Sequence, residues 1–306
     1  MQTSPVVTSG LTRHFGQITA VDGLGLEVPR NSIYGFLGPN GAGKTTTIRL
    51  LLGLIQPHAG GVCLFGEPLR DQRRSLLSRV GALVESPSLY PNLTGRENLE
   101  VTRCLIGGSK AQVDRALQIV HLEDAAYRRV RGYSSGMRQR LGVALALLGE
   151  PELLILDEPT NGLDPAGMKD MRLLLRHLPQ AYDLTVFLST HLLSEVEQVA
   201  THIGIIQAGR LRFQGTLDDL QAQMREQVVV GVDQPEMAVQ HLLQAGWAVQ
   251  SNGGHRLAIA ANGRSDAALI NAQLVAQGVN VYRLELERPT LEDVFMALTN
   301  DGQGGF

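Results

Sequence analysis

The sequence predicts an α/β protein with a phosphate-binding loop, an antiparallel β-subdomain and an inserted α-helical subdomain, followed by a small α+β domain. Three observations support this prediction. The glycine-rich segment GPNGAGKTT at 38–46 lies between an apolar β-prone run and a helix-forming run. The apolar run LLIL at 153–156 ends in two carboxylates. Residues 227–299 follow a β-α-β-β-α-β order, which is the ferredoxin-like arrangement.

Composition excludes several classes of protein. The net charge of −3 gives no electrostatic case for nucleic-acid binding, which usually shows as a basic surplus. The two cysteines, Cys63 and Cys104, indicate no disulfide framework and suit a reducing cytosol. We expect no signal peptide at the N-terminus, and no apolar run reaches 18 residues. If the protein works on a membrane, another chain must supply the spans.

The segment at 38–46 has the G-x-x-x-x-G-K-[S/T] spacing of a P-loop in its required strand–turn–helix context. The glycines let backbone N–H groups curl around an anion, and the start of the following helix adds partial positive charge. Lys44 supplies a full charge for the β- and γ-phosphates, and the Thr45 hydroxyl is placed to bind Mg²⁺. The predicted nucleotide-binding residues here are Gly38, Pro39, Asn40, Gly41, Ala42, Gly43, Lys44, Thr45 and Thr46.

Asp157 and Glu158 follow the apolar run at the carboxyl end of a predicted parallel strand, where ligands bind in open α/β sheets. One carboxylate can hold Mg²⁺, and its neighbour can activate water. His191 follows another predicted strand, TVFLST at 185–190. Its imidazole is either a packed or solvated group, or a hydrogen-bond donor to the γ-phosphate or the attacking water.

The remaining segments surround these motifs. Short β-runs fill the chain to about Pro29; there Phe15 is either an adenine-stacking aromatic or a core residue. A strand at 80–85 ends at Glu85, which is either solvated or close to the metal and γ-phosphate. The segment 93–149 is helical, and a turn at 161–168 caps a helix running to about Leu178. A hairpin follows at 203–215, with its turn at 208–209.

Together these motifs resemble the ATP-binding cassette (ABC) family of P-loop NTPases over residues 3–220. GPNGAGKTT is similar to the Walker A loop and LLILDEP to the Walker B strand with its catalytic glutamate. YSSGM at 133–137 stands where the family carries its LSGGQ signature. NGLD at 161–164 matches the D-loop, and STH at 189–191 the switch histidine. Phe15 falls at the position of the family's adenine-stacking aromatic.

The resemblance implies a sandwich in which two chains, predicted to be a homodimer, clasp ATP and Mg²⁺ between one P-loop and the other signature. Residues carried over for nucleotide contact are Phe15, Ser134, Ser135, Gly136 and Asp164. Glu158 would orient or deprotonate water, and His191 would hold the γ-phosphate. Hydrolysis would separate the halves and drive a multi-span permease supplied by another chain, which places this subunit at the cytoplasmic face of the membrane.

Departures from the family pattern restrict the resemblance to one branch of the family. Ser135 replaces the commonest glycine and Met137 the commonest glutamine, but Ser134 and Gly136 are intact. Glu85 stands at the usual Q-loop glutamine, and the segment 80–99 is very similar to the bacitracin-export and lantibiotic-immunity branch. This similarity implies export of an antimicrobial peptide, an antibiotic or another hydrophobic compound. We predict that Glu85 is both a catalytic residue and a Mg²⁺ ligand that couples metal occupancy to the membrane subunit.

We predict an ATP-binding domain at 1–222, an accessory domain at 227–299 and a disordered tail at 300–306. The accessory domain could serve dimerisation or regulation, or only stabilise the chain. One alternative function is a soluble ABC ATPase acting on ribosomes or nucleic acid; the single uninterrupted cassette and the absence of a basic patch argue against it. Another is a non-catalytic ATP-binding module, which the intact Lys44, Asp157, Glu158 and His191 disfavour. The substrate and the direction of transport stay open at this stage.

Overall fold

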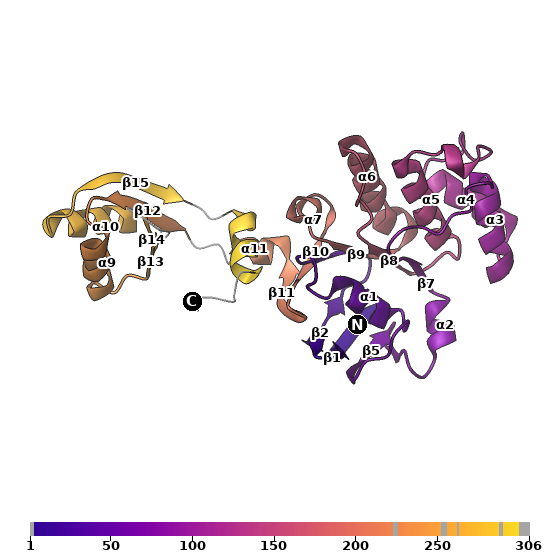
Figure 1. Ribbon diagram of the computed structural model, residues 1–306, viewed down its shortest axis with the longest axis horizontal. Coiled ribbons are helices and arrows are strands. Elements are labelled where there is room, and N and C mark those ends of the chain that lie inside the picture. The colour runs from indigo at the N-terminus through magenta and orange to yellow at the C-terminus, as the bar shows by residue number, and fades with distance from the viewer. Residues whose placement is uncertain (1–2, 223–225, 252–255, 262, 288–289, 300–306) are drawn as a thin grey trace. The chain divides into compact units, whose positions relative to one another are not determined.

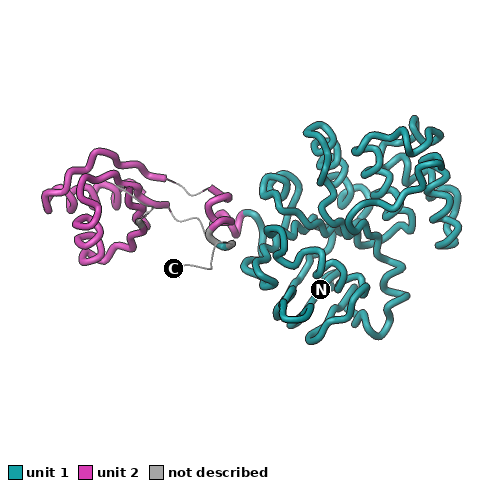
Figure 2. The backbone as a smooth tube through the Cα atoms, viewed as in Figure 1, with its two compact units in different colours: residues 1–217, 298–306 teal, residues 218–297 magenta. Residues whose placement is uncertain are grey.

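The computed structural model describes residues 3–222, 226–251, 256–261, 263–287 and 290–299 (Figure 1). The tail at 300–306, predicted to be disordered, lies outside these residues. Contacts divide the chain into two compact units, 1–217 with 298–306, and 218–297 (Figure 2). The predicted domain boundary, between 222 and 227, stays a prediction.

The larger unit is built on a six-stranded sheet in the order β11-β10-β4-β9-β8-β7. All neighbours in it pair in parallel except β10 and β11, which form an antiparallel hairpin. Its strands are β4 (Ile33–Leu37), β7 (Val80–Leu83), β8 (Leu153–Asp157), β9 (Thr185–Thr190), β10 (His202–Gln207) and β11 (Arg210–Thr216). Every residue of β4, β8 and β9 is buried, as expected for strands covered on both faces.

Two apolar cores cover the faces of this sheet. One core joins alternate residues of β4, β8 and β9 to α1 (Lys44–Leu51) and to a second, antiparallel sheet. That sheet, in the order β2-β1-β5-β6, is the predicted antiparallel β-subdomain. Its strands are β1 (Val6–Phe15), β2 (Ile18–Leu24), β5 (Ala59–Leu64) and β6 (Glu67–Pro68), with β3 (Glu27–Val28) paired to β1; the short helix α2 (Arg73–Leu77) follows.

The other core joins the opposite face of the sheet to the inserted helical subdomain and to α6 (Pro165–Tyr182). The subdomain contains α3 (Gly95–Ile106), α4 (Lys110–Ile119), the 3₁₀ turn η1 (Val130–Gly132) and α5 (Ser135–Leu147). Helix α3 begins with a capping box: the Glu97 N–H donates to Thr94 Oγ1 at 3.2 Å, and the Thr94 N–H donates to Glu97 Oε2 at 2.7 Å. Two further helices, α7 (Leu193–Val199) and α8 (Leu217–Ala222), lie between β9 and β10 and after β11.

The smaller unit has the predicted ferredoxin-like order. Its elements are β12 (Gln227–Val232), α9 (Pro235–Gln244), β13 (Val249–Ser251), β14 (Arg256–Ala260), α10 (Arg264–Ala276) and β15 (Val281–Glu287), followed by α11 (Leu291–Thr299). The antiparallel sheet has the order β13-β14-β12-β15. Residues Val228, Val230, Leu257 and Ile259 pack one of its faces against α9 and α10. The predicted fold class is therefore confirmed for both parts of the chain.

Candidate functional site

The phosphate-binding loop connects β4 to α1 and depends on glycine at two close approaches. Gly43 has a φ of 109°, and a Cβ there would lie 2.3 Å from the Ala20 carbonyl oxygen. A Cβ at Gly38 would lie 2.5 Å from the Ile206 carbonyl oxygen. Since both approaches are to backbone, any side chain would force the loop apart. Helix α1 begins directly after the loop, at Lys44, so the first N–H groups of the helix have no partner within it.

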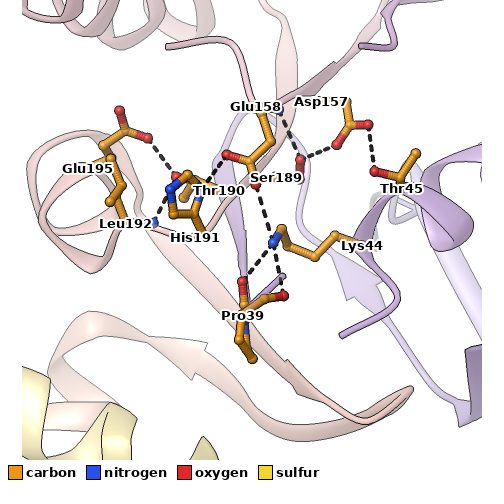
Figure 3. A network of polar contacts seen from close by, with 11 residues as sticks. Pro39, Lys44, Thr45, Asp157, Glu158, Ser189, Thr190, His191, Leu192 and Glu195 are labelled. Carbon is orange, nitrogen blue, oxygen red and sulfur yellow. Dashed lines mark hydrogen bonds and ion pairs between the residues drawn. The ribbon is translucent and has the colours of Figure 1, made fainter. Parts of the chain in front are cut away.

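Lys44 is held at the centre of the loop (Figure 3). Its Nζ donates to the carbonyl oxygens of Gly38 at 2.7 Å and Pro39 at 3.2 Å. The same ammonium lies 3.2 Å from Glu158 Oε1. Because Lys44 is only 6% exposed, its charge acts with little screening by solvent.

Asp157 brings the phosphate loop and the sheet together. Thr45 Oγ1 donates to Asp157 Oδ2 at 2.9 Å, and Ser189 Oγ donates to Asp157 Oδ1 at 2.5 Å. The parallel register of β8 and β9 sets Asp157 beside Ser189. All three groups lie at the carboxyl ends of strands or at the start of α1, as the sequence predicts for Asp157 and Thr45. The role of Ser189 was not predicted.

Glu158 accepts on both carboxylate oxygens. Oε1 faces Lys44, and Oε2 lies 2.8 Å from His191 Nδ1. Its backbone is left-handed, with a φ of 48°, and its N–H lies 3.0 Å from Ser189 Oγ. Figure 3 shows the glutamate between the lysine and the histidine. The two residues predicted to handle water and γ-phosphate are thus in direct contact at the P-loop.

A buried carboxylate, that of Glu195, fixes the start of the loop that carries His191. Thr190 Oγ1 donates to Glu195 Oε2 at 2.6 Å and accepts from the Leu192 N–H at 3.1 Å. Glu195, in α7, is 2% exposed. No sequence pattern distinguished it from the solvated acids of an ordinary helix.

The other predicted residues lie apart from this network. Phe15 ends β1 and is 44% exposed, with the Arg13 guanidinium carbon 4.8 Å from its ring centre. Glu85 lies two residues beyond the end of β7 and forms an ion pair with Arg49 at the last turn of α1. Within the described residues, no hydrogen bond or ion pair joins Glu85 to Thr45 or Asp157.

The signature segment forms the start of α5. Ser134 is the N-cap, and its Oγ accepts from the Met137 N–H at 3.2 Å. Asp164 is the N-cap of α6 and accepts from the Gly167 N–H at 3.1 Å. A Cβ at Gly136 would lie 3.9 Å from the Gly167 Cα, so the two helix starts are neighbours. Ser135 is exposed beside them, and none of these residues has a described hydrogen bond or ion pair to Lys44, Asp157 or Glu158.

Comparison with known proteins decides the family. Residues 21–161 match the ABC transporter family, and the chain is 41% identical to the bacitracin transport ATP-binding protein BcrA of Bacillus licheniformis, over 98% of this chain and 99% of that protein. The chain belongs to the ABC transporter family. Residues 215–299 match the C-terminal domain of DrrA1-3-like ATP-binding proteins.

Other relatives of this ABC protein agree. The daunorubicin resistance ATP-binding protein DrrA3 of Streptomyces coeruleorubidus is 35% identical, over 98% of each chain. The lantibiotic transport ATP-binding protein SrtF of Streptococcus pyogenes is 36% identical, over 68% of this chain and 89% of that protein. A solved ATP-binding subunit of an ABC transporter superposes with a TM-score of 0.64 at 29% identity, covering 72% of this chain and 93% of that chain.

Family membership confirms the predicted resemblance and identifies an ATP-hydrolysing subunit of a transporter. The alternative of an ABC ATPase that acts on ribosomes or nucleic acid is not favoured by any of these relatives. None of the helices in the described ranges combines the length and apolar character needed to cross a bilayer.

Proposed function

We propose that this ABC subunit hydrolyses ATP with Mg²⁺ at the Lys44–Glu158 site and drives export of an antimicrobial peptide or another hydrophobic antibiotic through a separate permease. One observation carries the proposal: a single carboxylate, Glu158, contacts both the P-loop lysine and the imidazole of His191. A carboxylate in that position can orient or deprotonate a water beside the γ-phosphate, and the imidazole can donate to the phosphate.

The residues present fit a Mg²⁺ ion. Thr45 Oγ1 and Asp157 Oδ2 are 2.9 Å apart, and both are oxygen ligands of the kind that Mg²⁺ prefers. No cluster of three or more His, Cys, Asp or Glu side chains is placed for a metal in the described part of the chain, which suits an ion that takes one or two protein ligands, phosphate oxygens and water. Bound there, the ion would neutralise charge on the β- and γ-phosphates.

The two predicted domains would have different roles. We assign nucleotide binding to residues 1–222, with adenine on Phe15 and phosphates on the loop from Gly38 to Thr46. Ser134, Ser135, Gly136 and Asp164 would face the nucleotide of a second copy, and residues 227–299 would form an accessory domain. The subunit would sit at the cytoplasmic face of the membrane, held there by its permease.

The substrate class rests on the relatives. Bacitracin, a lantibiotic and daunorubicin appear in the names of relatives that cover most of this chain, and all three are antibiotics. Deletion of the gene in its host should lower resistance to at least one of them. Restoring the wild type should restore resistance, whereas Glu158→Gln should not. Equal resistance in all strains to all three compounds would overturn the substrate assignment.

The permease is tested separately. The tagged chain should retain a multi-span membrane protein, in about equal amount, from detergent-solubilised host membranes. Glu158→Gln is the matched control, because it alters hydrolysis without altering the outer surface. Recovery of ribosomes or nucleic acid with no membrane protein would refute the transport role itself.

A further inference from the structure

The smaller unit leaves one long edge of its sheet unpaired. β15 pairs with β12 on one side, and it stands last in the strand order β13-β14-β12-β15. Among the described residues, no strand pairs with its other side. With seven residues, β15 is longer than the opposite edge strand, β13, which has three. An unpaired edge offers a row of backbone N–H and C=O groups to another strand.

Apolar side chains extend the core to this edge. Leu284 and Leu286 pair in register with Val230 and Val228, which are fully buried, yet each of the two leucines is 38% exposed. They therefore lie on the face of the sheet that α9 and α10 cover, at its open margin. The hydrophobic effect favours covering such a margin.

Helix α10, which packs over β15, adds to the margin. Gln273 accepts from the Trp247 indole N–H at 2.8 Å, so this flank of α10 faces the α9 side of the unit. At 100° per residue, Val275 lies 200° from Gln273, on the flank turned toward the β15 edge. Val275 is 57% exposed. We call Val275, Leu284 and Leu286 the β15 margin.

The sequence of β15, VYRLELE, is complementary to itself when it runs antiparallel to a second copy. A two-fold axis at Leu284 would set Arg283 opposite Glu285 of the second copy, twice. Moving the axis to Arg283 would set two arginines opposite each other. Moving it to Glu285 would pair Arg283 with Glu287 but set two glutamates opposite each other at the centre. Opposite charges stabilise a cross-strand pair and like charges destabilise it, so one register is favoured.

The charged side chains are available for this exchange. Arg283 and Glu285 pair within the strand at 2.7 Å and are each more than two-fifths exposed. Exchanging partners across a two-fold axis would keep Arg283 and Glu285 paired, while the two copies of Leu284 meet on the other face. The interface would thus be apolar on the face of the sheet that the helices cover and charged on the opposite face, and a two-fold axis would make it self-complementary.

We propose that the C-terminal units of two copies of this chain pair through β15, antiparallel about Leu284, to form one continuous sheet of eight strands. We take a second copy as the partner, because a strand of the same sequence meets both the charge pattern and the apolar margin. The interface belongs to the accessory unit and goes beyond the nucleotide site, so it does not depend on the transported substrate.

Cysteine cross-linking of the full chain tests the register. With Cys63 and Cys104 changed to Ser, Leu284→Cys should form an intermolecular disulfide, since residues directly opposite in antiparallel strands lie within disulfide reach. Leu286→Cys is a matched control: it is also a leucine with the same exposure on the same face. Its two copies would be four residues apart along the strands, or roughly 13 Å, which is too far.

We expect the disulfide dimer of Leu284→Cys, with or without ATP, to exceed that of Leu286→Cys by about tenfold or more. Equal cross-linking at both positions, or none at residue 284 in either condition, would overturn the proposal. Both substitutions are at half-exposed sites. If both variants melt at the same temperature as the parent chain, a folding defect does not explain the difference in cross-linking.

Charge exchange tests the same register without cysteine. Arg283→Glu or Glu285→Arg alone would set like charges opposite each other at two symmetric positions, and sedimentation should show weaker dimerisation, by roughly tenfold. The double variant Arg283→Glu with Glu285→Arg should restore it. If the double variant dimerises no more strongly than the single variants, or if the single variants dimerise as strongly as the wild type, the proposed pairing is wrong.

Discussion

Glu158 owes its position to its backbone as much as to its side chain. Its φ of 48° is unusual for a residue with a Cβ and costs on the order of 1 kcal/mol. Two bonds hold it there: the Glu158 N–H lies 3.2 Å from the Ser189 carbonyl oxygen, and the Asn161 N–H donates to the Glu158 carbonyl at 3.0 Å. The carboxylate is thereby turned out of the strand toward Lys44 and His191, whereas Asp157 stays in the sheet.

Ser189 is the residue through which the two acids are positioned. Its hydroxyl donates to Asp157 and lies within hydrogen-bond distance of the Glu158 N–H. We expect Ser189→Ala to raise the Mg²⁺ concentration for half-maximal ATPase about tenfold, because residues that orient a metal ligand typically contribute 10- to 100-fold to affinity. Titration of Mg²⁺ at fixed ATP measures this. Ser78→Ala, which removes an exposed hydroxyl bonded to the Ser75 carbonyl, is the control and should leave the titration unchanged.

Glu85 allows a direct choice between two roles. If it assists the metal, Glu85→Gln should raise the Mg²⁺ requirement and reduce transport for each ATP hydrolysed, since an amide is a weaker ligand than a carboxylate. If Glu85 serves only the ion pair with Arg49, Arg49→Gln should change the Mg²⁺ requirement and the transport as much as Glu85→Gln does. We expect only Glu85→Gln to shift the Mg²⁺ titration. An unchanged ATPase rate and unchanged transport in Glu85→Gln would refute any role in coupling.

How far sequence predicts such a site depends on the range of its contacts. Lys44 and Thr45 were predictable, because a local strand–turn–helix motif fixes them. The partners of Glu158 were predictable only through the family resemblance, since Lys44 and Glu158 are far apart in the chain. Ser189 and Glu195 gained roles from sheet register and from burial, which composition and local spacing do not reveal.

At the scale of elements, one buried aromatic group supports the central sheet. The Phe187 ring of β9 stacks on Tyr34 of β4, with centroids 5.5 Å apart and planes 7° apart, and lies 5.4 Å from Phe36. Phe187→Ala should lower the free energy of unfolding by about 3–5 kcal/mol, as truncating a fully buried aromatic does. Denaturant unfolding measures this loss.

Phe15→Ala is the matched comparison, because this ring is 44% exposed at the end of β1. Stability should change by less than about 1 kcal/mol. If the ring stacks on adenine, ATP affinity should nevertheless fall roughly tenfold, since aromatic–base stacking contributes about 1–3 kcal/mol. An unchanged ATP affinity would make Phe15 a surface residue without a nucleotide role.

An ion pair joins the edge strand β7 to β8 and makes stability depend on pH. The Arg79 guanidinium donates to Glu152 at 2.6 and 3.0 Å, and this hydrogen bonding lowers the pKa of the Glu152 carboxyl below its ordinary value of 4.5. The folded state therefore binds fewer protons than the unfolded state. The stability that the Arg79–Glu152 pair contributes is fully present above pH 4.5. It is lost as the pH falls through the lower pKa that Glu152 has in the folded state.

Glu152→Gln should therefore flatten the decline of stability below pH 4.5, measured by thermal unfolding across that range. Because the Glu152 side chain is 38% exposed, the effect should not exceed about 1 kcal/mol. Arg79→Gln removes the cause of the shift and should flatten the same range. A steeper acid decline in either variant would contradict the assignment.

The sequence predicted helices and strands well where apolar periodicity was strong, but it did not predict where they end. The helix expected to stop near Leu178 continues to Tyr182, with Pro179 inside its last turn. Leu178 is fully buried and Tyr182 packs on the same core, so tertiary packing extends the helix past a residue that disfavours it. The strand expected to reach Glu85 ends at Leu83, because Glu85 adopts a φ of 60°.

At the scale of the whole molecule, the larger unit has two helix starts suited to an anion, and within the described residues no hydrogen bond or ion pair joins them. The start of α1 carries Lys44, and the start of α5 carries Ser134 beside the start of α6. Each is a helix N-terminus with free N–H groups, so each favours a phosphate. We propose that the nucleotide uses both ends and therefore lies between two copies, each giving one of the two ends.

Mixing two inactive variants tests this arrangement. Lys44→Ala destroys the P-loop, and Ser134→Arg blocks the signature, so each variant alone should lose ATPase activity. In a mixed dimer, the P-loop of the Ser134→Arg chain meets the signature of the Lys44→Ala chain, and one complete site forms. Random pairing makes half of the dimers mixed, with one site of two intact, so an equal mixture should recover roughly a quarter of wild-type activity, the two sites being independent. If ATP were instead hydrolysed within one chain, the mixture would stay as inactive as its components, because no chain in it has both ends intact.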